Sequence, residues 1–355
     1  MYYILVINPG STSTKMAVFE NEKNIIKETI RHNDKELSKF DSIAEQKEYR
    51  KKTILEQLEK KGFDLKKLSA VVGRGGLLKP LKSGTYRVND KMLEDLRKAE
   101  RGEHASNLGG LIAYEIAQPL SIPAFIVDPV SVDEYNPLAY YSGLKGVERE
   151  SLSHALNTKA VAKRYSKEKN IEYDKINLVI AHLGSGISVS AHKKGRMIDV
   201  TNSKEEGAFS PERSGSIPCV KLAKLCFSGK YDLKQIIKMI FREGGLYSYL
   251  KTKDFSEIMT MVESGDNYAK EVVDAMIYQI AKEIGAMATV LDGKVDAIII
   301  TGGMAFSGYL IKELKQKIGF ISSEIIVYPG EDELKALNEG VLRVLKGEEK
   351  EVVYE

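Results

Sequence analysis

The chain has 355 residues, a formal net charge of +3 and charged side chains at 29% of its positions. This mixed charge does not fit the basic stripe of a nucleic-acid-binding protein or the cationic face of a membrane-binding helix. The length predicts two domains, and because neither a membrane-spanning run nor a signal-peptide pattern is present, we expect a cytoplasmic protein.

The first predicted element is a hairpin with a polar tip, over residues 4–20 (ILVINPGSTSTKMAVFE). Gly10 allows the backbone to approach an anion, and the hydroxyls and Lys15 after it supply donors, which favours a phosphate ligand. The stretch is not a Walker loop, because Thr14 and Met16 flank the lysine where that motif needs a Gly and a Ser or Thr.

Side chains two apart on a strand lie on one side of it, so Ser11, Ser13 and Lys15 can face a single ligand. A polyphosphate would suit these residues and Asn8. The alternative is an ordinary hairpin with a Ser/Thr-rich turn.

Three further residues of the first half carry chemistry. Arg74 lies in a strand that runs into glycines (68–76, LSAVVGRGG), and it is either a surface charge or a clamp for carboxylate or phosphate oxygens. His104 opens a predicted helix and is either a ligand contact or a loop residue. Asp128 follows an apolar strand (124–129, AFIVDP) and either holds magnesium or caps the following turn.

The second half repeats the order of the first. A hairpin (177–191, NLVIAHLGSGISVSA), a strand into glycines (296–303, DAIIITGG) and a strand into proline and glycine (324–330, EIIVYPG) follow one another. The segments between the strands show helical periodicity in both halves, as in ILEQLEKKGF and VVDAMIYQIAKEIGAMATVL. We therefore predict an α/β protein of two duplicated actin-like (ribonuclease H-like) domains, with mixed sheets flanked by helices and an interdomain cleft.

The turn of the second hairpin offers a second phosphate site. Gly184 and Gly186 let backbone amides approach a phosphate, Ser185 can donate, and His182 ends the apolar strand before them. A lone His is more often a satisfied core or surface residue, but this position between a strand end and a glycine turn favours a ligand contact.

Two more segments are predicted to line the cleft. The loop 203–216 is rich in Gly, Pro, Ser and charge, and its Arg213 could form a second clamp with Arg74. Gly302 and Gly303 stand where a nucleobase or ribose could press against the backbone, although a tight strand-to-helix turn explains them about as well.

We place the domains at 1–150 and 151–355, and we also consider a return of the last helix to the first domain. Cys219 and Cys226 are seven residues apart, a spacing that suits one face of a helix and matches no metal pattern. We interpret both cysteines as structural.

Two segments, NPGSTSTK (8–15) and AHLGSGISVS (181–190), resemble the signature segments of the acetate and butyrate kinase family of actin-like phosphotransferases. RGG, VDP, PERSG, TGG and PGEDEL follow in family order, so the resemblance covers essentially the whole chain. NPGSTSTK in place of the acetate kinases' NAGSSS, and the shorter chain, make the sequence more similar to butyrate kinases.

The resemblance implies that the first domain holds the carboxylate and the phosphoryl group, and that the second holds the nucleotide. It implies ATP or ADP and Mg²⁺ as cofactors. By matched motif it assigns catalysis or phosphate contact to Asn8, Ser11, Ser13, Lys15, Arg74, His104, His182 and Arg213, nucleotide contact to His182, Gly184, Ser185, Gly186, Asp254, Gly302 and Gly303, and magnesium binding to Asp128 and Asp332. Ungapped matching favours Asp332 over its neighbours Glu331 and Glu333.

The sequence departs from acetate kinases at two places. Glu150-Ser151-Leu152-Ser153-His154 stands where they have His-Gly-Thr-Ser-His, so one cationic donor is missing and the role of Glu150 is open. VGRGG lacks the Val-His that they place between this Arg and its glycines, which would leave room for a longer acyl chain.

The implied reaction is the reversible, in-line phosphorylation of a short fatty acid by ATP, with butyrate or a branched relative such as isobutyrate as the acceptor. A carboxylic acid with a pKa of roughly 4 to 5 is already ionised at neutral pH, so no general base is required and catalysis should depend on cations and placement. The expected partners are a short-chain carboxylate, its acyl phosphate and further copies of the chain in a homo-oligomer.

Two alternatives stay open. A sugar or polyol kinase of the same fold would need an Asp base in the second domain, and the sequence offers no clear one. A non-catalytic chaperone or filament protein would normally need a substrate domain or polymer contacts, and no extra segment of suitable length is present.

Overall fold

The computed structural model describes residues 1–355, apart from the side chain of Asp34. Contacts divide the chain into two compact units. The first unit comprises Met1–Asp133, Ala155–Asn157 and Asp332–Glu355, and the second comprises Glu134–His154 and Thr158–Glu331. These contact-based units do not test the domain limits of 1–150 and 151–355, which stay a prediction.

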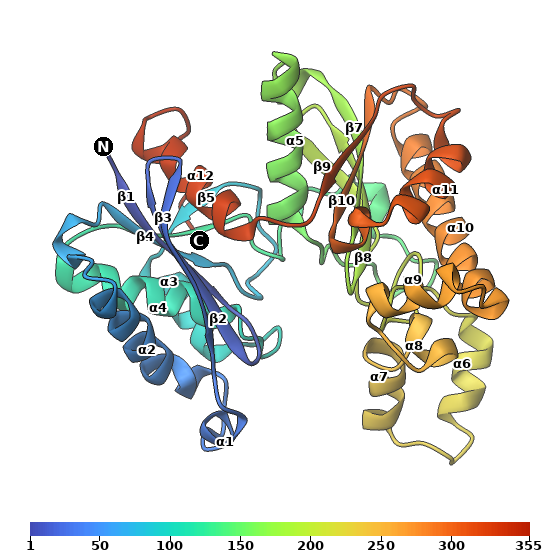
Figure 1. Ribbon diagram of the computed structural model, residues 1–355, viewed down its shortest axis with the longest axis horizontal. Helices are drawn as coiled ribbons and strands as arrows, with labels where there is room; N and C mark the ends of the chain where they lie inside the picture. The colour runs from blue at the N-terminus through green and yellow to red at the C-terminus, as the bar shows by residue number, and fades with distance from the viewer. The chain divides into compact units, whose positions relative to one another are not determined.

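The first unit contains a six-stranded mixed sheet (Figure 1). Its strands are β1 (Tyr3–Pro9), β2 (Ser13–Glu20), β3 (Lys23–Arg31), β4 (Ala70–Arg74), β5 (Thr85–Arg87) and β6 (Ala124–Val127), in the spatial order β3-β2-β1-β4-β6-β5. β1 is antiparallel to β2 and parallel to β4, which is in turn parallel to β6. The hairpin predicted over residues 4–20 is confirmed as the pair β1 and β2.

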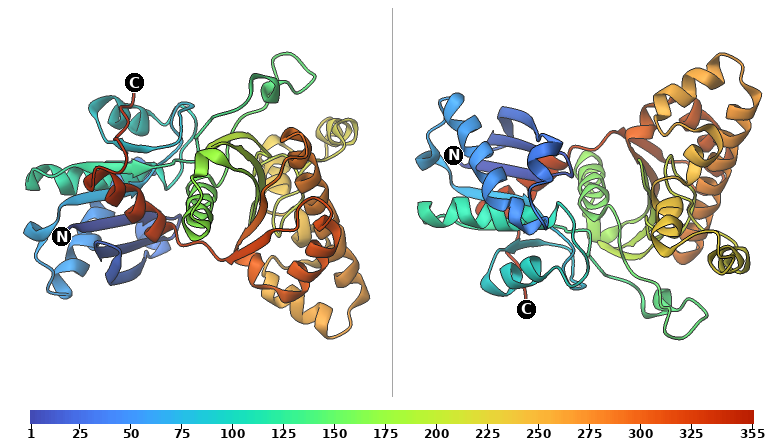
Figure 2. Two further views of the ribbon diagram at one scale, coloured as in Figure 1. Left: turned by 90° about the horizontal axis from the view of Figure 1, so that it is seen from above. Right: turned by 90° about the horizontal axis from the view of Figure 1, so that it is seen from below.

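Helices cover both faces of this sheet (Figure 2). The helices of this unit are α1 (Asp34–Leu37), α2 (Lys47–Lys60), α3 (Asp90–Lys98), α4 (Asn107–Ala117) and α12 (Glu333–Leu345). A Cβ on Gly340 of α12 would meet Val127 of β6, whereas a Cβ on Gly110 of α4 would meet Ile126. Because neighbouring residues of a strand point to opposite faces, α12 and α4 cover opposite faces of the sheet.

β4 and α4 cross at two glycines. A Cβ on Gly73 would lie 1.9 Å from the carbonyl oxygen of Gly109, and a Cβ on Gly109 would lie 2.2 Å from the carbonyl oxygen of Arg74. Only residues without a side chain fit at this crossing. The close approach places the first turn of α4 beside the end of β4, where Arg74 lies.

The second unit contains a five-stranded mixed sheet (Figure 1). Its strands are β7 (Asn177–Leu183), β8 (Ile187–Lys193), β9 (Arg196–Val200), β10 (Ala297–Gly302) and β11 (Ile325–Pro329), in the spatial order β11-β10-β7-β8-β9. β7 is antiparallel to β8 and parallel to β10, which is parallel to β11. A hairpin followed by two parallel strands therefore occurs in both units, which confirms the repetition and the α/β class predicted from the sequence.

The helices of this part of the chain are α5 (Ala155–Lys169), α6 (Cys219–Cys226), α7 (Leu233–Phe241), α8 (Gly245–Leu250), α9 (Phe255–Glu263), α10 (Asn267–Val290) and α11 (Gly308–Ile318). Leu178 of β7 is buried with Val161 of α5. The next residue, Val179, is buried in the core that contains Ile277 of α10. α5 and α10 therefore cover opposite faces of the second sheet.

Two predictions about single segments have different outcomes. Cys219 and Cys226 do lie on one helix, α6, but both are exposed, so the interpretation of these cysteines as structural was wrong. The helices in the described part of the chain include none that is long and apolar enough to cross a membrane.

Candidate active site

The turn between β1 and β2 borders a pocket of about 320 Å³ in the first unit. Thr14 is fully buried, whereas Ser13 and Lys15 on either side of it line the pocket, as the alternation of side chains along a strand predicts. The lining consists of Asn8, Pro9, Gly10, Ser11, Ser13, Lys15, Arg74, His104, Ser106 and Glu333. The structure thus brings together the site residues predicted in the first half, apart from Asp128.

A carboxylate of the chain itself lies against two of these residues. Nη1 of Arg74 forms an ion pair with Oε1 of Glu333, and Nδ2 of Asn8 donates to Oε2 of the same carboxylate. The side chains of Arg74 and Glu333 are only 17% and 15% exposed. Arg74 and Asn8 therefore present donors to the two oxygens of one planar anion in a place mostly shielded from water.

His104 lies in the loop before α4 and not in the helix, which begins at Asn107. Its Nδ1 accepts a hydrogen bond from the backbone N–H of Ser106 at 3.2 Å and lies 2.7 Å from the hydroxyl of Ser106. Because Nδ1 is an acceptor, the proton of the neutral imidazole is on Nε2, which makes this nitrogen a donor.

Three consecutive acids precede or begin α12, and Glu333 is the one among them that lines the pocket. Asp332 caps α12, because its Oδ1 accepts from the backbone N–H of Lys335 at 3.3 Å. The carboxylate of Glu331 lies 3.6 Å from Nε2 of His182. The structure thus gives Asp332 a helix-capping role, and its contact with magnesium stays a prediction.

Asp128 anchors a turn at the end of β6. It has a φ of +38° and is 5% exposed, and its Oδ1 accepts from the hydroxyl of Ser83 at 2.6 Å and from the N–H of Gly84 at 2.8 Å. Among the described residues, no group of three or more His, Cys, Asp and Glu is placed to hold a metal ion. Magnesium commonly uses one or two carboxylates with nucleotide phosphates and waters, so single acids such as Asp128 and those beside α12 fit an ion that arrives with a nucleotide.

The turn between β7 and β8 contains or contacts part of the residues predicted in the second half, namely His182, Gly184, Ser185, Gly186 and Arg213. The N–H of Gly184 donates to the carbonyl of Gly186 at 3.1 Å, and the hydroxyl of Ser210 donates to the carbonyl of Ser185. A Cβ on Gly186 would lie 2.3 Å from Nη1 of Arg213, so this guanidinium lies directly on the glycine turn. Burial lowers the pKa of Arg213, but an arginine titrates so far above neutrality that the side chain stays charged. Its pairing with Arg74 of the first unit stays a prediction.

His182 is the last residue but one of β7 and stacks on a second histidine. The ring centroids of His154 and His182 are 3.8 Å apart, and the ring planes are inclined by 9°. Nδ1 of His154 is 2.9 Å from the hydroxyl of Ser188 on β8. Acetate kinases have two histidines in the segment that corresponds to Glu150–His154, and His154 is the one that this sequence keeps. It lies directly against His182.

Two of the other predicted nucleotide contacts, Gly302 and Asp254, have structural roles of their own. Gly302 has a φ of +93°, and a Cβ there would lie 2.3 Å from the carbonyl oxygen of Leu183, whereas no described atom lies within 4 Å of a Cβ on Gly303. Asp254 caps α9, because its Oδ1 accepts from the N–H of Ser256 at 2.9 Å. Backbone packing explains Gly302 and helix capping explains Asp254, so their nucleotide contacts stay predictions.

The glycines after Arg74 are closely packed by other segments. A Cβ on Gly75 would lie 2.5 Å from Cβ of Pro129, and a Cβ on Gly76 would lie 2.2 Å from Oδ1 of Asn107. Protein atoms fill the space beside both glycines, and the expected room for a longer acyl chain stays a prediction.

Sequence analysis assigned no role to Arg50, Ser106 or His154. Arg50 carried a usable signal, because it stands four and eight residues before Ile54 and Leu58, on the buried face of α2. An arginine at a core-facing position of a helix needs buried acceptors, and the sequence alone does not show where they are.

Comparison with known proteins gives the same fold. The model of the acetokinase family matches residues 137–322, slightly more than half of the chain. The crystal structure of acetate kinase from Porphyromonas gingivalis is similar, with a TM-score of 0.82 and 20% sequence identity over 97% of this chain and 100% of that one. A propionate kinase from Francisella tularensis subsp. tularensis SCHU S4 gives 0.78 and 19% over 96% and 99%, and acetate kinase from Entamoeba histolytica gives 0.76 and 15% over 95% and 98%. At these identities the structural likeness establishes the fold, two mixed α/β sheets flanked by helices, as in these acetate and propionate kinases.

Proposed function

The chain belongs to the acetokinase family, and from this membership we propose that it transfers the γ-phosphoryl group of ATP reversibly to the carboxylate of a short-chain fatty acid. The preferred acceptor in this proposal is butyrate or a branched relative such as isobutyrate. The likeness of residues 8–15 to butyrate kinases supports this choice over acetate.

The observation that carries the proposal is the pocket beside the first hairpin turn. Arg74 and Asn8 hold the two oxygens of the Glu333 carboxylate there, and Lys15, Ser11 and Ser13 line the same pocket. A site that already binds a carboxylate next to a lysine and two hydroxyls suits an acid anion and a phosphoryl group side by side.

The chemistry of the proposed reaction asks for charge compensation more than for proton transfer. The attacking carboxylate is ionised at neutral pH, so the difficult step is its approach to the γ-phosphorus of a polyanion. Arg74 orients the carboxylate, Lys15 and Nε2–H of His104 offset the negative charge of the phosphoryl oxygens, and the donors of the turn fix its direction.

In this proposal the second unit holds the nucleotide. The glycine turn of residues 184–186 would approach the phosphates, with Arg213 and His182 beside it. Magnesium, which Asp128 and Asp332 would help to hold, neutralises phosphate charge when it is bound with ATP. The position of Glu333 in the pocket makes it a further candidate for this ligand set.

We also expect a homo-oligomer. Val220 and Phe227 at α6 and Leu233 on α7 are 70%, 92% and 75% exposed, and α7 buries little besides Ile236. Exposed apolar side chains gathered on neighbouring segments are typical of protein contact surfaces. A second copy of the chain is the simplest partner for such a surface.

Trapping of the acyl phosphate tests the function. Purified protein with ATP, Mg²⁺ and hydroxylamine should form hydroxamates with straight and branched acids of two to six carbons, with the highest kcat/KM for butyrate or isobutyrate. Glycerol and glucose, assayed by ADP release, should give no turnover. Phosphorylation of a polyol without hydroxamate formation would favour the sugar-kinase alternative, and ATP binding without either product would favour a non-catalytic protein.

A further inference from the structure

Arg50 is a buried cation on the face of α2 that packs against the first hairpin. It is 1% exposed, and it shares this face with Ile54 and Leu58, which are fully buried. Its hydrogen bonds go to neutral oxygens, among them Oε1 of Gln46, which accepts from Nε at 3.1 Å and from Nη2 at 2.8 Å. A buried charge that is compensated by neutral oxygens needs several well-directed acceptors.

Most of these acceptors come from the turn beside the pocket. Nη1 of Arg50 donates to the carbonyl of Gly10 at 2.8 Å, to the carbonyl of Ser13 at 3.2 Å and to the hydroxyl of Thr14 at 3.2 Å. Nη2 donates to the carbonyl of Ser11 at 2.9 Å. The planar guanidinium thus gathers four oxygens of one turn, which an ammonium group cannot do with the same geometry.

The remaining carbonyl of the turn is also engaged. The backbone N–H of His32 donates to the carbonyl of Thr12 at 2.9 Å, and the N–H of Gly10 closes the turn on the carbonyl of Ser13 at 2.7 Å. The carbonyl oxygens of residues 10–13 therefore all accept hydrogen bonds from the protein.

This arrangement dictates where the amide donors point. In a trans peptide the C=O of one residue and the N–H of the next point in opposite directions. When the carbonyls of Gly10, Ser11 and Thr12 are held toward Arg50 and His32, the N–H groups of the residues that follow them point away from these two groups. Successive amide donors of this kind form an anion site, and Gly10, Ser11 and Ser13 line the pocket.

Arg50 supports the turn from outside the hairpin. Four residues, 10–13, lie between the last paired residues Pro9 and Thr14, and neither Ser11 nor Thr12 has a positive φ. A loop of this length is most often built around a type I turn, which needs no positive φ. The carbonyls of Gly10 and Ser11 in this loop accept from Arg50, so its hydrogen bonds help to hold the loop in place.

We propose that Arg50 is a positioning residue, which fixes the turn of residues 10–14 so that its amides and hydroxyls bind a phosphate chain. The proposal rests on the proposed function at one point only, where it identifies this phosphate chain as part of ATP or of the migrating phosphoryl group. Arg50 does not touch the anion in this account, because its donors are occupied by the turn and by Gln46.

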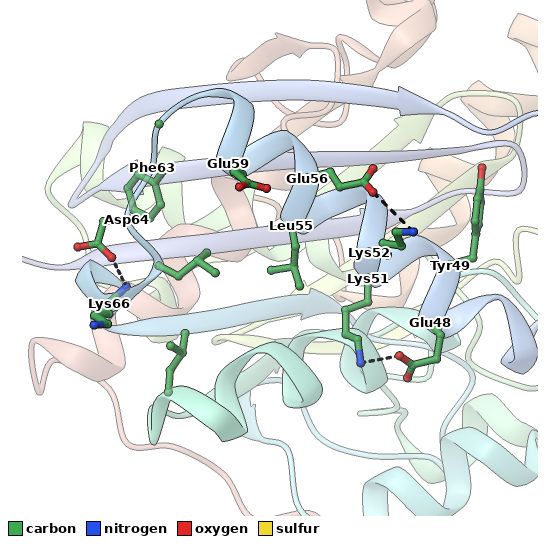
Figure 3. Close-up of a pocket in the computed structure, with 13 residues that line it drawn as sticks. Glu48, Tyr49, Lys51, Lys52, Leu55, Glu56, Glu59, Phe63, Asp64 and Lys66 are labelled. Atoms are coloured by element: carbon green, nitrogen blue, oxygen red, sulfur yellow. Dashed lines mark hydrogen bonds and ion pairs between the residues drawn. The ribbon is translucent and has the colours of Figure 1, made fainter.

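Two variants of Arg50 and one matched control separate positioning from simple stability. Arg50→Lys keeps the charge without the planar fork, and Arg50→Met keeps the length without the charge. Lys52→Met removes a cation two positions further along the same helix. Figure 3 shows Lys52 on the outward face of α2 beside Glu56, where its side chain is 77% exposed.

The readouts are the Kd for inorganic tripolyphosphate by calorimetry at fixed ionic strength, the thermal midpoint, and kcat and KM for ATP and butyrate. At a temperature where all variants are folded, both Arg50 variants should bind tripolyphosphate at least about tenfold more weakly than wild type. Their kcat should fall while KM for butyrate changes little, and Lys52→Met should match wild type throughout. Lys15→Met should also weaken the binding, because Lys15 lines the same pocket.

Folded Arg50 variants that bind tripolyphosphate as tightly as wild type would overturn the inference, whatever their thermal midpoints. Tripolyphosphate binding that Lys15→Met leaves unchanged would overturn it as well, because the anion would then not use the turn. If wild type forms no hydroxamate but the Arg50 variants lose anion binding, the inference stands and the kinase proposal fails. If wild type is active and the Arg50 variants equal it in binding and turnover, the kinase proposal stands and the inference fails.

Discussion

Lys15 on β2 and Arg74 on β4 are two cations on the strands that flank β1. Both line one pocket, and they differ in what they hold. Arg74 pairs with the Glu333 carboxylate, whereas Lys15 is exposed beside the turn. An acid anion that enters the pocket must therefore compete with Glu333 for Arg74, and the planar fork of the guanidinium suits this exchange.

Removal of either cation should lower turnover much more than stability. Arg74→Gln and Lys15→Met should each reduce kcat for butyrate about a hundredfold, or about 3 kcal/mol, which is the usual cost of losing one donor to a transition state. The thermal midpoint should change by a few degrees at most for Lys15→Met. Steady-state kinetics and thermal unfolding check this, and near-normal turnover in both variants would contradict the placement of the site.

His32 should make the stability depend on pH. Burial and the neighbouring Arg50 lower the pKa of His32 from 6.5 to about 4 in the folded chain, and its Nε2 lies 2.8 Å from the hydroxyl of Thr14. Between pH 6.5 and 4 the unfolded chain therefore binds a proton at this site that the folded chain excludes, and stability falls as the pH falls. We expect about 1–2 kcal/mol of loss across this range, since partial solvation reduces the effect.

Urea unfolding of wild type and His32→Gln at several pH values between 7 and 4 measures this contribution. The variant lacks the titrating group, so its stability should depend less steeply on pH than that of wild type, even if its stability at pH 7 is lower. Parallel curves for the two proteins would show that His32 is not the source.

At the scale of elements, the crossing of β4 and α4 fixes the position of Arg74. Gly109→Ala would place a methyl group 2.2 Å from the carbonyl oxygen of Arg74, so we expect about 2–3 kcal/mol of destabilisation and a lower kcat. Gly285→Ala on α10 is the matched control, because, apart from the adjacent backbone of α10, no described atom lies within 4 Å of a Cβ there and alanine favours the helix by about 0.5–1 kcal/mol. The account would be contradicted if both substitutions changed the free energy of unfolding in the same direction.

The hairpins, the parallel strands that follow them and the main helices were predictable because their signals are local. Apolar runs on either side of glycine-containing turns marked β1, β2, β7 and β8, and helical spacing marked α2 and α10. The contacts that shape the pocket are not local. Arg50 reaches Gly10 across 40 residues, and Glu333 reaches Asn8 across 325.

The same distinction applies to the candidate site. The types of residue at the strand ends indicated Asn8, Lys15, Arg74 and His182, since strand ends are where α/β proteins bind ligands. The sequence could not show that Asp254 caps a helix or that Pro129 fills the space beside Gly75, because these depend on the packing of separate segments.

At the scale of the whole molecule, the exposed apolar side chains of α6 and α7 should mediate self-association. Phe227→Asp combined with Leu233→Lys should reduce the molar mass found by light scattering to that of a single chain, because buried charges of this kind disfavour the contact. The thermal midpoint at low protein concentration should hardly change, since both side chains are exposed within one chain. Equal molar masses for the variant and wild type would place the contact elsewhere.

The central claim is that a carboxylate oxygen of a short fatty acid attacks the γ-phosphorus of ATP. Butyrate labelled with ¹⁸O in both carboxylate oxygens tests it most directly, with ATP, Mg²⁺ and hydroxylamine present. Hydroxylamine attacks the acyl carbon and releases phosphate that keeps the bridging oxygen, so the account predicts one ¹⁸O in each phosphate released, seen by ³¹P NMR or mass spectrometry. Unlabelled phosphate, or ADP release without butyryl hydroxamate, would contradict it.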